Sequence, residues 1–272
     1  MSQSYEKVGR REAIRRGLPV CAAGLTLYPI KMSHYEDFLT CKDAIVLRLS
    51  SLPVKYLTQD YFSALFSFEI DSYQATRKRI GLLPRVMHFF ELSLRMEKNK
   101  EDARIEVEHT DQNGRVAVTN ICVTTSGETV KITPIEFSNV IRPILAELNG
   151  LELPDESQNI DLVIAYEQKK MLSEEKRTLH TSTDDLIASV AYHSHCRERD
   201  ICDWTVREFE LRRAAIDRDK RYSMYGQAEM SGMVSFKNGN PAPSWCYDLL
   251  DESMGTQSLS ELNFGGAKQK TQ

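Results

Sequence analysis

The stretch RIEVEHTDQNGRVAVTNICVTTSGETVKI, residues 104–132, carries the clearest fold signal in the chain. Apolar residues alternate with polar ones in three runs, which is the pattern of strands that bury one face. Asn113-Gly114 separates the first two runs and is a strong signal for a tight hairpin, and Ser126-Gly127 separates the last two. The stretch therefore predicts a three-stranded antiparallel meander.

A helix is predicted directly after the meander. Thr133-Pro-Ile-Glu136 has the spacing of a capping box, with proline at the first helical position. Gly150 is expected to stop this helix. Apolar residues recur at the spacing of one buried helix face, and they are Phe137, Val140, Ile141, Ile144, Leu145 and Leu148. A small sheet covered by such a helix is a natural two-layer unit.

Helical signals dominate on both sides of this unit, as capping residues followed by apolar side chains at helical spacing. The expected elements are a short hairpin within 18–28 and helices over 33–49, from 58 onward, and over 84–96, 181–191 and 205–230. The expected face of the helix over 84–96 consists of Val86, Phe89, Phe90 and Leu94. The fold class predicted from the sequence is therefore α+β, mainly helical, with the meander in the middle.

Four regions are expected along the chain. They are an N-terminal hairpin plus helical region (1–103), the meander with its covering helix (104–150), a helical C-terminal region (161–250) and a disordered tail (251–272), with a linker over 151–160. The tail is polar and has few large apolar residues, so it cannot bury enough surface to order itself.

The composition favours a soluble protein that stays inside the cell. The chain has 272 residues, enough to bury a core, and a formal net charge of −4 from 35 basic and 39 acidic side chains. Proteins that neutralise many phosphates usually carry a basic excess, so no nucleic acid partner is expected. No stretch approaches the roughly 18 apolar residues of a membrane helix, so no membrane association is expected.

The N-terminus and the cysteines agree with that compartment. The apolar run from Leu18 to Leu27 follows four arginines and mimics a signal peptide, but Pro19 and Gly24 interrupt it. The cysteines are spread through the chain, as free thiols of cytosolic proteins are. They are Cys21, Cys41, Cys122, Cys196, Cys202 and Cys246.

One group of side chains resembles a metal site. His193 and Cys196 could share a helix face, with Cys202 in the next turn, but this gives only three zinc ligands. The alternative is a helix end with surface histidines and partly buried thiols, and we favour it. The common phosphate-binding, nucleophile-elbow and zinc-protease motifs are missing from the sequence. We therefore expect that the protein is not an enzyme and has no catalytic residue and no cofactor. His193, Cys196 and Cys202 remain weak candidates for metal ligands.

Two further patterns concern binding. Residues 184–225 have a helix–turn–helix outline, but DNA-binding versions use a shorter turn and a recognition helix with a clearer basic bias. Apolar residues also gather near the C-terminus, and Met and aromatic side chains are enriched on surfaces that bind proteins adaptably. The candidate partner-binding residues are Tyr225, Met230, Phe236 and Trp245. A tail that folds back over its own helix is the alternative.

Three stretches carry a family resemblance. They are LPVCAAGLTLYPI (18–30) with YEDF (35–38), DDLIASVAYH (184–193) with DWTVREF (203–209), and SGMVSFKNGNPAPSW (231–245). Together they resemble bacteriophage proteins from Gram-positive hosts that are encoded in the tail region and are taken as tail-assembly chaperones or minor tail and baseplate components. The resemblance covers about half of the chain in pieces and carries no catalytic motif.

The resemblance implies a non-enzymatic phage tail assembly factor of the chaperone type, at work in the host cytoplasm. Its expected partners are other phage tail proteins, such as a tape-measure protein. Three alternatives remain open: a structural tail or baseplate subunit that stays in the virion tail, a helix–turn–helix-like DNA-binding regulator, and a metal-assisted enzyme.

Overall fold

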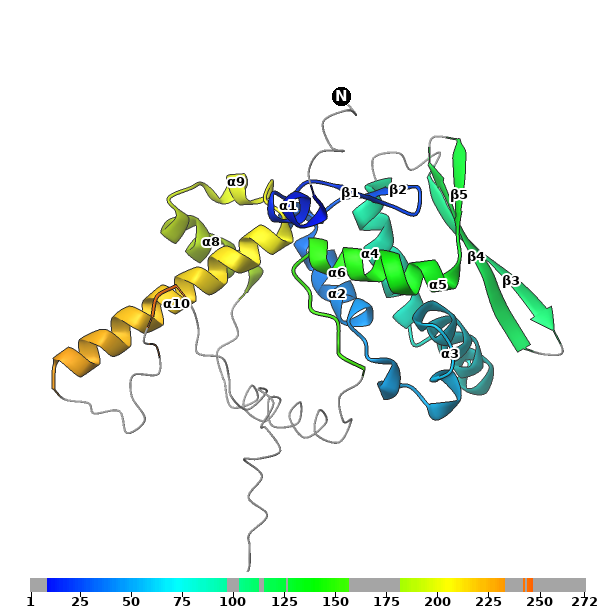
Figure 1. The fold of residues 1–272 in the computed structure, drawn as a ribbon. Helices are drawn as coiled ribbons and strands as arrows, with labels where there is room; N and C mark the ends of the chain where they lie inside the picture. Colours follow the sequence, from blue (N-terminus) through cyan, green and yellow to red (C-terminus); the bar gives the residue numbers. More distant parts are fainter. Residues whose placement is uncertain are drawn as a thin grey trace, which may run out of the picture. The chain divides into compact units, whose positions relative to one another are not determined.

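The computed structural model describes residues 9–96, 103–112, 115–125, 127–156, 182–232, 242 and 244–246. The chain divides into two compact units, residues 1–210 and 211–272. All the strands belong to the larger unit, and so does every buried residue of the described chain. The mainly helical α+β class with a three-stranded antiparallel sheet is confirmed (Figure 1). The four regions expected along the chain stay a prediction.

The N-terminal hairpin follows α1 (Arg10–Arg15) and forms as predicted. β1 (Val20–Ala22) pairs antiparallel with β2 (Leu25–Leu27). Ala23 and Gly24 connect the strands with φ of 49° and 76°. Two consecutive positive φ angles are the geometry of a type I′ turn, which suits the twist of a two-residue hairpin.

The first long helix is shorter than expected. α2 (Tyr35–Ile45) follows a 3₁₀ turn, η2 (Met32–His34), whereas the sequence predicts a helix over 33–49. The capping box predicted at Ser33 is not formed. The Ser33 N–H donates instead to the carbonyl oxygen of Cys202 at 3.2 Å, so pairing with a distant segment overrides the local capping signal. Two further 3₁₀ turns follow α2, namely η3 (Leu49–Ser51) and η4 (Val54–Tyr56).

The next two helices pack into the core. α3 (Tyr61–Thr76) begins after Asp60, whose carboxylate accepts the N–H of Ser63 at 3.0 Å. α4 (Leu82–Leu94) has Pro84 in its first turn, as predicted. Of the face predicted for this helix, Val86, Phe89 and Phe90 are buried and Leu94 is half-buried.

The predicted meander is confirmed. β3 (Arg104–Gln112), β4 (Arg115–Thr125) and β5 (Glu128–Ile132) pair antiparallel in that order. The register joins Gln112 to Arg115 and Thr125 to Glu128, so both connections are as short as the turn signals predict.

The helix predicted after the meander also forms, with one local change. α5 (Pro134–Glu136) and α6 (Arg142–Leu148) are joined by a π-helical segment, η6 (Phe137–Ile141). The capping box at Thr133 is present in both directions. Val140, predicted for the buried face, is exposed. Because a π segment rotates the residues within it relative to a regular α-helix, periodicity alone misplaced this side chain.

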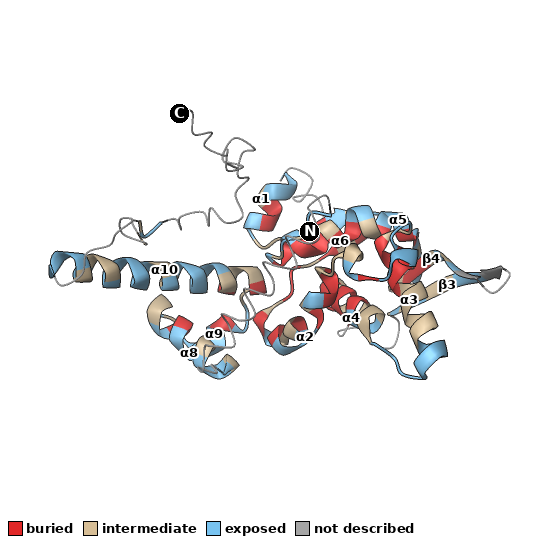
Figure 2. Cartoon of the chain, turned by 90° about the horizontal axis from the view of Figure 1, so that it is seen from below, coloured by how far each residue is buried: buried red, intermediate tan, exposed pale blue. Residues whose placement is uncertain are grey.

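Aromatic side chains join the helices to one another, and apolar side chains of the sheet are buried in the same core. Phe137 lies 5.0 Å from Phe62 and 5.3 Å from Phe90 between ring centroids, both edge to face. Ile121, Val123 and Ile132 of the sheet are fully buried. Figure 2 shows buried residues concentrated in α2, α4 and α6 of the larger unit.

Three helices follow residue 182. α8 (Thr183–Ser194) begins with a two-way capping box between Ser182 and Asp185. α9 (Glu198–Ile201) is a single turn, and α10 (Val206–Met230) is the longest helix described. Among the described residues, no helix combines the length and the apolar character needed to cross a membrane.

Candidate functional site

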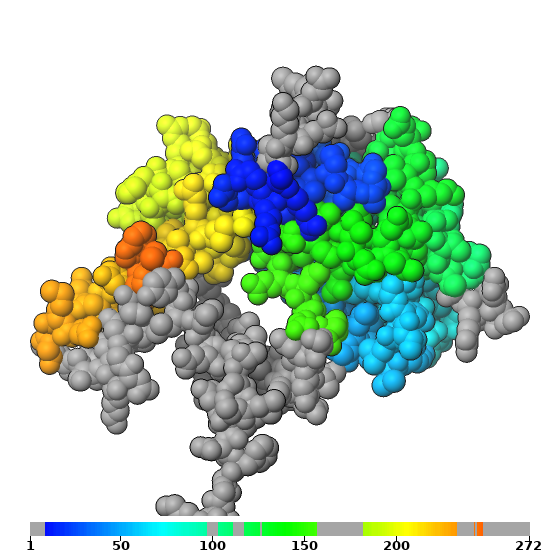
Figure 3. Space-filling view, viewed as in Figure 1, coloured from blue at the N-terminus to red at the C-terminus, as the bar shows by residue number. Residues whose placement is uncertain are grey.

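α10 carries the surface that the sequence predicts for partner binding. Only Val206 and Phe209, at its start, are buried. From Leu211 to Met230 no residue of the helix is buried, and its outer turns are open to view in yellow and orange in Figure 3. The large apolar side chains exposed on this part of the helix are Leu211, Tyr222, Met224 and Met230.

The four predicted binding residues have different surroundings. Met230 is 90% exposed and Trp245 is 63% exposed, so both present apolar surface. Tyr225 is half-buried, and Phe236 lies outside the described residues. Met224, which belongs to the apolar residues that the sequence shows near the C-terminus, and Leu211, which sequence reasoning missed, are each more than half exposed. Helical periodicity could not identify Leu211 as exposed, because a helix with no buried face has no pattern to read beyond its first turns.

Hydrogen bonds and an ion pair stabilise α10, most of which has no buried side chains. The hydroxyl of Thr205 accepts the N–H of Glu208 at 3.1 Å, which is one of the two hydrogen bonds of the predicted capping box. Further along, Arg221 Nε lies 3.2 Å from the carboxylate of Asp217, one turn apart. Such pairs at four-residue spacing stabilise solvated helices.

The candidate metal ligands do not form a centre. α8 ends at Ser194, and His195 follows with φ of 54°, so the chain turns away from the helix axis before Cys196. Cys196 is half-buried and Cys202 is exposed. In the described part of the chain, no three His, Cys, Asp or Glu side chains converge as a metal ion needs. The ring of His193 instead packs edge to face on Tyr192 at 5.2 Å.

Two of the stretches that carry the family resemblance meet in the fold. Lys31 and Thr205 form an isolated antiparallel bridge. On either side of it, the Met32 N–H donates to the carbonyl of Trp204 and the Val206 N–H donates to the carbonyl of Ile30, each at 2.9 Å. The segments 30–32 and 204–206, about 170 positions apart in sequence, are therefore joined by hydrogen bonds like those of a short antiparallel strand pair.

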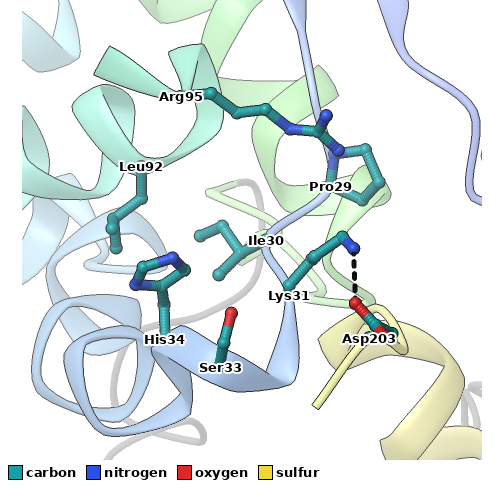
Figure 4. Close-up of a pocket in the computed structure, with 8 residues that line it drawn as sticks. All are labelled: Pro29, Ile30, Lys31, Ser33, His34, Leu92, Arg95 and Asp203. Atoms are coloured by element: carbon teal, nitrogen blue, oxygen red, sulfur yellow. Dashed lines mark hydrogen bonds and ion pairs between the residues drawn. The ribbon is translucent and has the colours of Figure 1, made fainter. Parts of the chain in front are cut away.

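A cavity opens beside this junction. Its volume is about 240 Å³. It is lined by Pro29, Ile30, Lys31, Ser33, His34, Leu92, Arg95 and Asp203 (Figure 4). The lining comes from three places: the segment between β2 and α2, the C-terminal end of α4, and the turn before α10.

Charged groups surround the apolar floor of this cavity. Lys31 Nζ lies 3.1 Å from Asp203 Oδ1. Arg95 follows α4 with φ of 55°, and its guanidinium carbon lies 4.1 Å from the centroid of the Tyr28 ring. His34 Nδ1 is 4.0 Å from the carboxylate of Asp37, so the imidazole lies at an acidic edge.

The backbone beneath the cavity is held by one buried side chain. Asn149 is 2% exposed. Its Oδ1 accepts the N–H of Ile30 at 2.8 Å, and its Nδ2 donates to the carbonyl of Leu145 at 2.8 Å. The covering helix thus fixes the segment that forms the floor.

Sequence reasoning did not identify this cavity. Lys31, Arg95 and Asp203 are separated by more than 60 residues at each step and come together only in the tertiary structure. The sequence offers no motif that joins them.

Comparison of the chain with protein-family models, with curated proteins and with solved structures gives no match.

Proposed function

We propose that this protein is a non-enzymatic, chaperone-type assembly factor of a bacteriophage tail. It binds an unassembled tail component, such as a tape-measure protein, in the host cytoplasm. The resemblance of the stretches 18–38, 184–209 and 231–245 to phage tail-region proteins supports the class of function. The exposed apolar side chains of α10 support the mode of binding.

One observation carries the binding mode: α10 presents Leu211, Met224 and Met230 to solvent on a helix with no buried residue beyond Phe209. Methionine is unbranched and polarizable, so it adapts to partner surfaces of different shape. At about 100° per residue these three side chains point to different sides of α10, so an apolar segment of a client would wrap around the helix to cover them and be released when the client assembles. The interaction between α10 and the client would be a reversible apolar contact of modest size.

The same surface also fits a structural tail or baseplate subunit that remains in the virion. The regulator alternative has less support, because the connection between α8 and α10 spans residues 195–205 and contains α9, whereas DNA-binding helix–turn–helix units use a tight turn.

The binding mode is tested by co-expression with a tape-measure protein and size-exclusion chromatography. We expect the two chains to co-migrate, and the double variant Met224→Lys, Met230→Lys to separate them. The matched control, Ser223→Lys with Gln227→Lys, adds the same charge at exposed polar positions of the same helix and should leave the complex intact. Co-migration that is lost equally in both variants would reflect charge alone and contradict the proposal.

The choice between assembly factor and virion subunit is tested by mass spectrometry. An assembly factor is abundant in the infected-cell lysate and missing from purified particles. A fixed copy number in particles identifies a structural subunit and rejects the chaperone role.

A further inference from the structure

We propose that the cavity between Ile30 and Arg95 is a binding site for a carboxylate, presented either by a small organic acid or by an acidic side chain of a peptide. This site is independent of the apolar surface of α10. The inference rests on the balance of charge in the cavity, on its size and on its apolar floor.

The charges that line the cavity do not balance. Among the described residues that line it, there are two permanent cations, Lys31 and Arg95, and one carboxylate, that of Asp203. Lys31 is paired with Asp203 at 3.1 Å. Among the described residues the side chain of Arg95 forms no ion pair, and its one polar interaction is with the ring of Tyr28. A guanidinium presents parallel N–H donors that match the two oxygens of a carboxylate, so a second carboxylate fits the remaining cation.

The size of the cavity limits the ligand. Small-molecule pockets usually have volumes of about 300–1,000 Å³. At about 240 Å³ this cavity is below that range, so it suits one side chain or a short organic acid and is too small for a nucleotide. The cavity reaches the otherwise buried side chains of Pro29, Ile30 and Leu92, which give a narrow apolar contact for the methylene group next to the carboxylate of such a ligand.

Asp203 already occupies one cation of the cavity with its carboxylate. Its side chain is 86% exposed, so it is held at the rim by its pairing with Lys31 and not by burial. A bound carboxylate would compete with Asp203 for Lys31 while it engages Arg95. Removal of the negative charge of Asp203 should therefore strengthen carboxylate binding, and loss of the guanidinium of Arg95 should weaken it.

Trp204 provides the readout, because it directly follows Asp203 and is one of only two tryptophans. In the full-length Trp245→Phe protein, the fluorescence of Trp204 is titrated at constant ionic strength with butyrate and with the capped peptide acetyl-Ala-Ala-Glu-Ala-Ala-amide. Butyramide and the same peptide with Gln in place of Glu are the neutral controls. Melting temperatures establish that each variant is folded.

We expect saturable binding of at least one carboxylate probe and none of its neutral counterpart. Arg95→Gln should weaken binding by at least about ten-fold, as the loss of a charge-assisted hydrogen-bond pair does. Arg95→Lys keeps the positive charge but loses the paired N–H donors of the guanidinium, so its affinity should lie between those of the unchanged protein and Arg95→Gln. Asp203→Asn should tighten binding by up to about five-fold, through the loss of one competing exposed ion pair. Arg85→Gln is the control, since Arg85 lies on α4 outside the lining.

Each result decides the proposal. Binding of butyrate alone identifies a free organic acid as the ligand, and binding of the glutamate peptide alone identifies an acidic side chain. Equal responses to acids and amides, an unchanged affinity in folded Arg95→Gln, or weaker binding in Asp203→Asn would overturn it.

Discussion

The guanidinium carbon of Arg142 lies 3.6 Å from the centroid of the Tyr61 ring, within the core that joins α6 to α3. Arg142 Nε donates to the carbonyl of Ile45 and Nη2 to the carbonyl of Leu47, each at 2.8 Å. Ile45 is the last residue of α2, where helix geometry leaves backbone acceptors without partners, and Leu47 follows two residues later. Burial lowers the pKa of Arg142 and raises the pKa of Tyr61. One buried cation therefore connects three helices.

Replacement of Arg142 should destabilise the fold strongly. Arg142→Met keeps an unbranched apolar stem but leaves two carbonyl acceptors without a donor, and we expect the free energy of unfolding to fall by about 2–4 kcal/mol. Urea denaturation followed by circular dichroism measures it. Arg11→Met, at an exposed position of α1, should change the free energy of unfolding by less than about 0.5 kcal/mol. Similar losses in both variants would contradict a specific role for Arg142.

Asn149 should matter through its two buried hydrogen bonds. Asn149→Ala leaves the N–H of Ile30 and the carbonyl of Leu145 without their side-chain partners. We expect a loss of about 1–3 kcal/mol in the free energy of unfolding, measured by urea denaturation. Asn139→Ala is the control, because Asn139 is an exposed asparagine of the same helical segment. A loss in Asn139→Ala as large as that in Asn149→Ala would reject this role.

The parts of the fold that the sequence predicts well are those with local causes. The meander depends on alternation and on turn residues between 104 and 132, and the helix after it depends on the capping box at Thr133. Both forms of signal act between residues close in the chain, so no distant contact is needed to read them.

The parts that it predicts poorly depend on distant partners. Ser33 and Glu36 have the spacing of a capping box, yet the N–H of Ser33 donates to the carbonyl of Cys202. Arg142 is not part of the buried face that periodicity predicts for its helix, yet it is buried against Tyr61. The cavity beside Ile30 unites three segments that no motif connects. In each case a tertiary contact, which a single sequence does not encode locally, decides the environment of the side chain.

The capping box at Thr133 allows a direct test of how a helix start contributes to stability. The Thr133 side chain accepts the backbone N–H of Glu136, three residues later. Thr133→Ala should lower the free energy of unfolding by about 1 kcal/mol, within the roughly 0.5–2 kcal/mol range of cap removal. Thr133→Ser keeps the acceptor oxygen and should retain most of the stability. Equal losses in the two variants, measured by urea denaturation, would show that the methyl group and not the cap is responsible.

The ion pair of Glu108 with Lys131 predicts a specific response to acid. The carboxylate of Glu108 accepts hydrogen bonds from Lys131 Nζ at 2.7 Å and from Asn120 Nδ2 at 2.8 Å. These bonds, that of Lys131 first, lower the pKa of Glu108 from 4.5 to about 2. Because the folded-state pKa lies below the unfolded value, the stabilisation is fully present above about pH 4.5 and is lost as the pH falls towards 2.

A double-mutant cycle of Glu108→Gln and Lys131→Met isolates this contribution. Urea midpoints of the four proteins, measured from pH 6 downwards, should show a coupling between the two residues that is constant near neutrality and declines below about pH 4.5. The sign is fixed by the direction of the pKa shift, because protonation of Glu108 removes the charge that Lys131 binds. A coupling that grows as the pH falls, or that does not change down to pH 3, would show that the pair does not stabilise the ionised carboxylate.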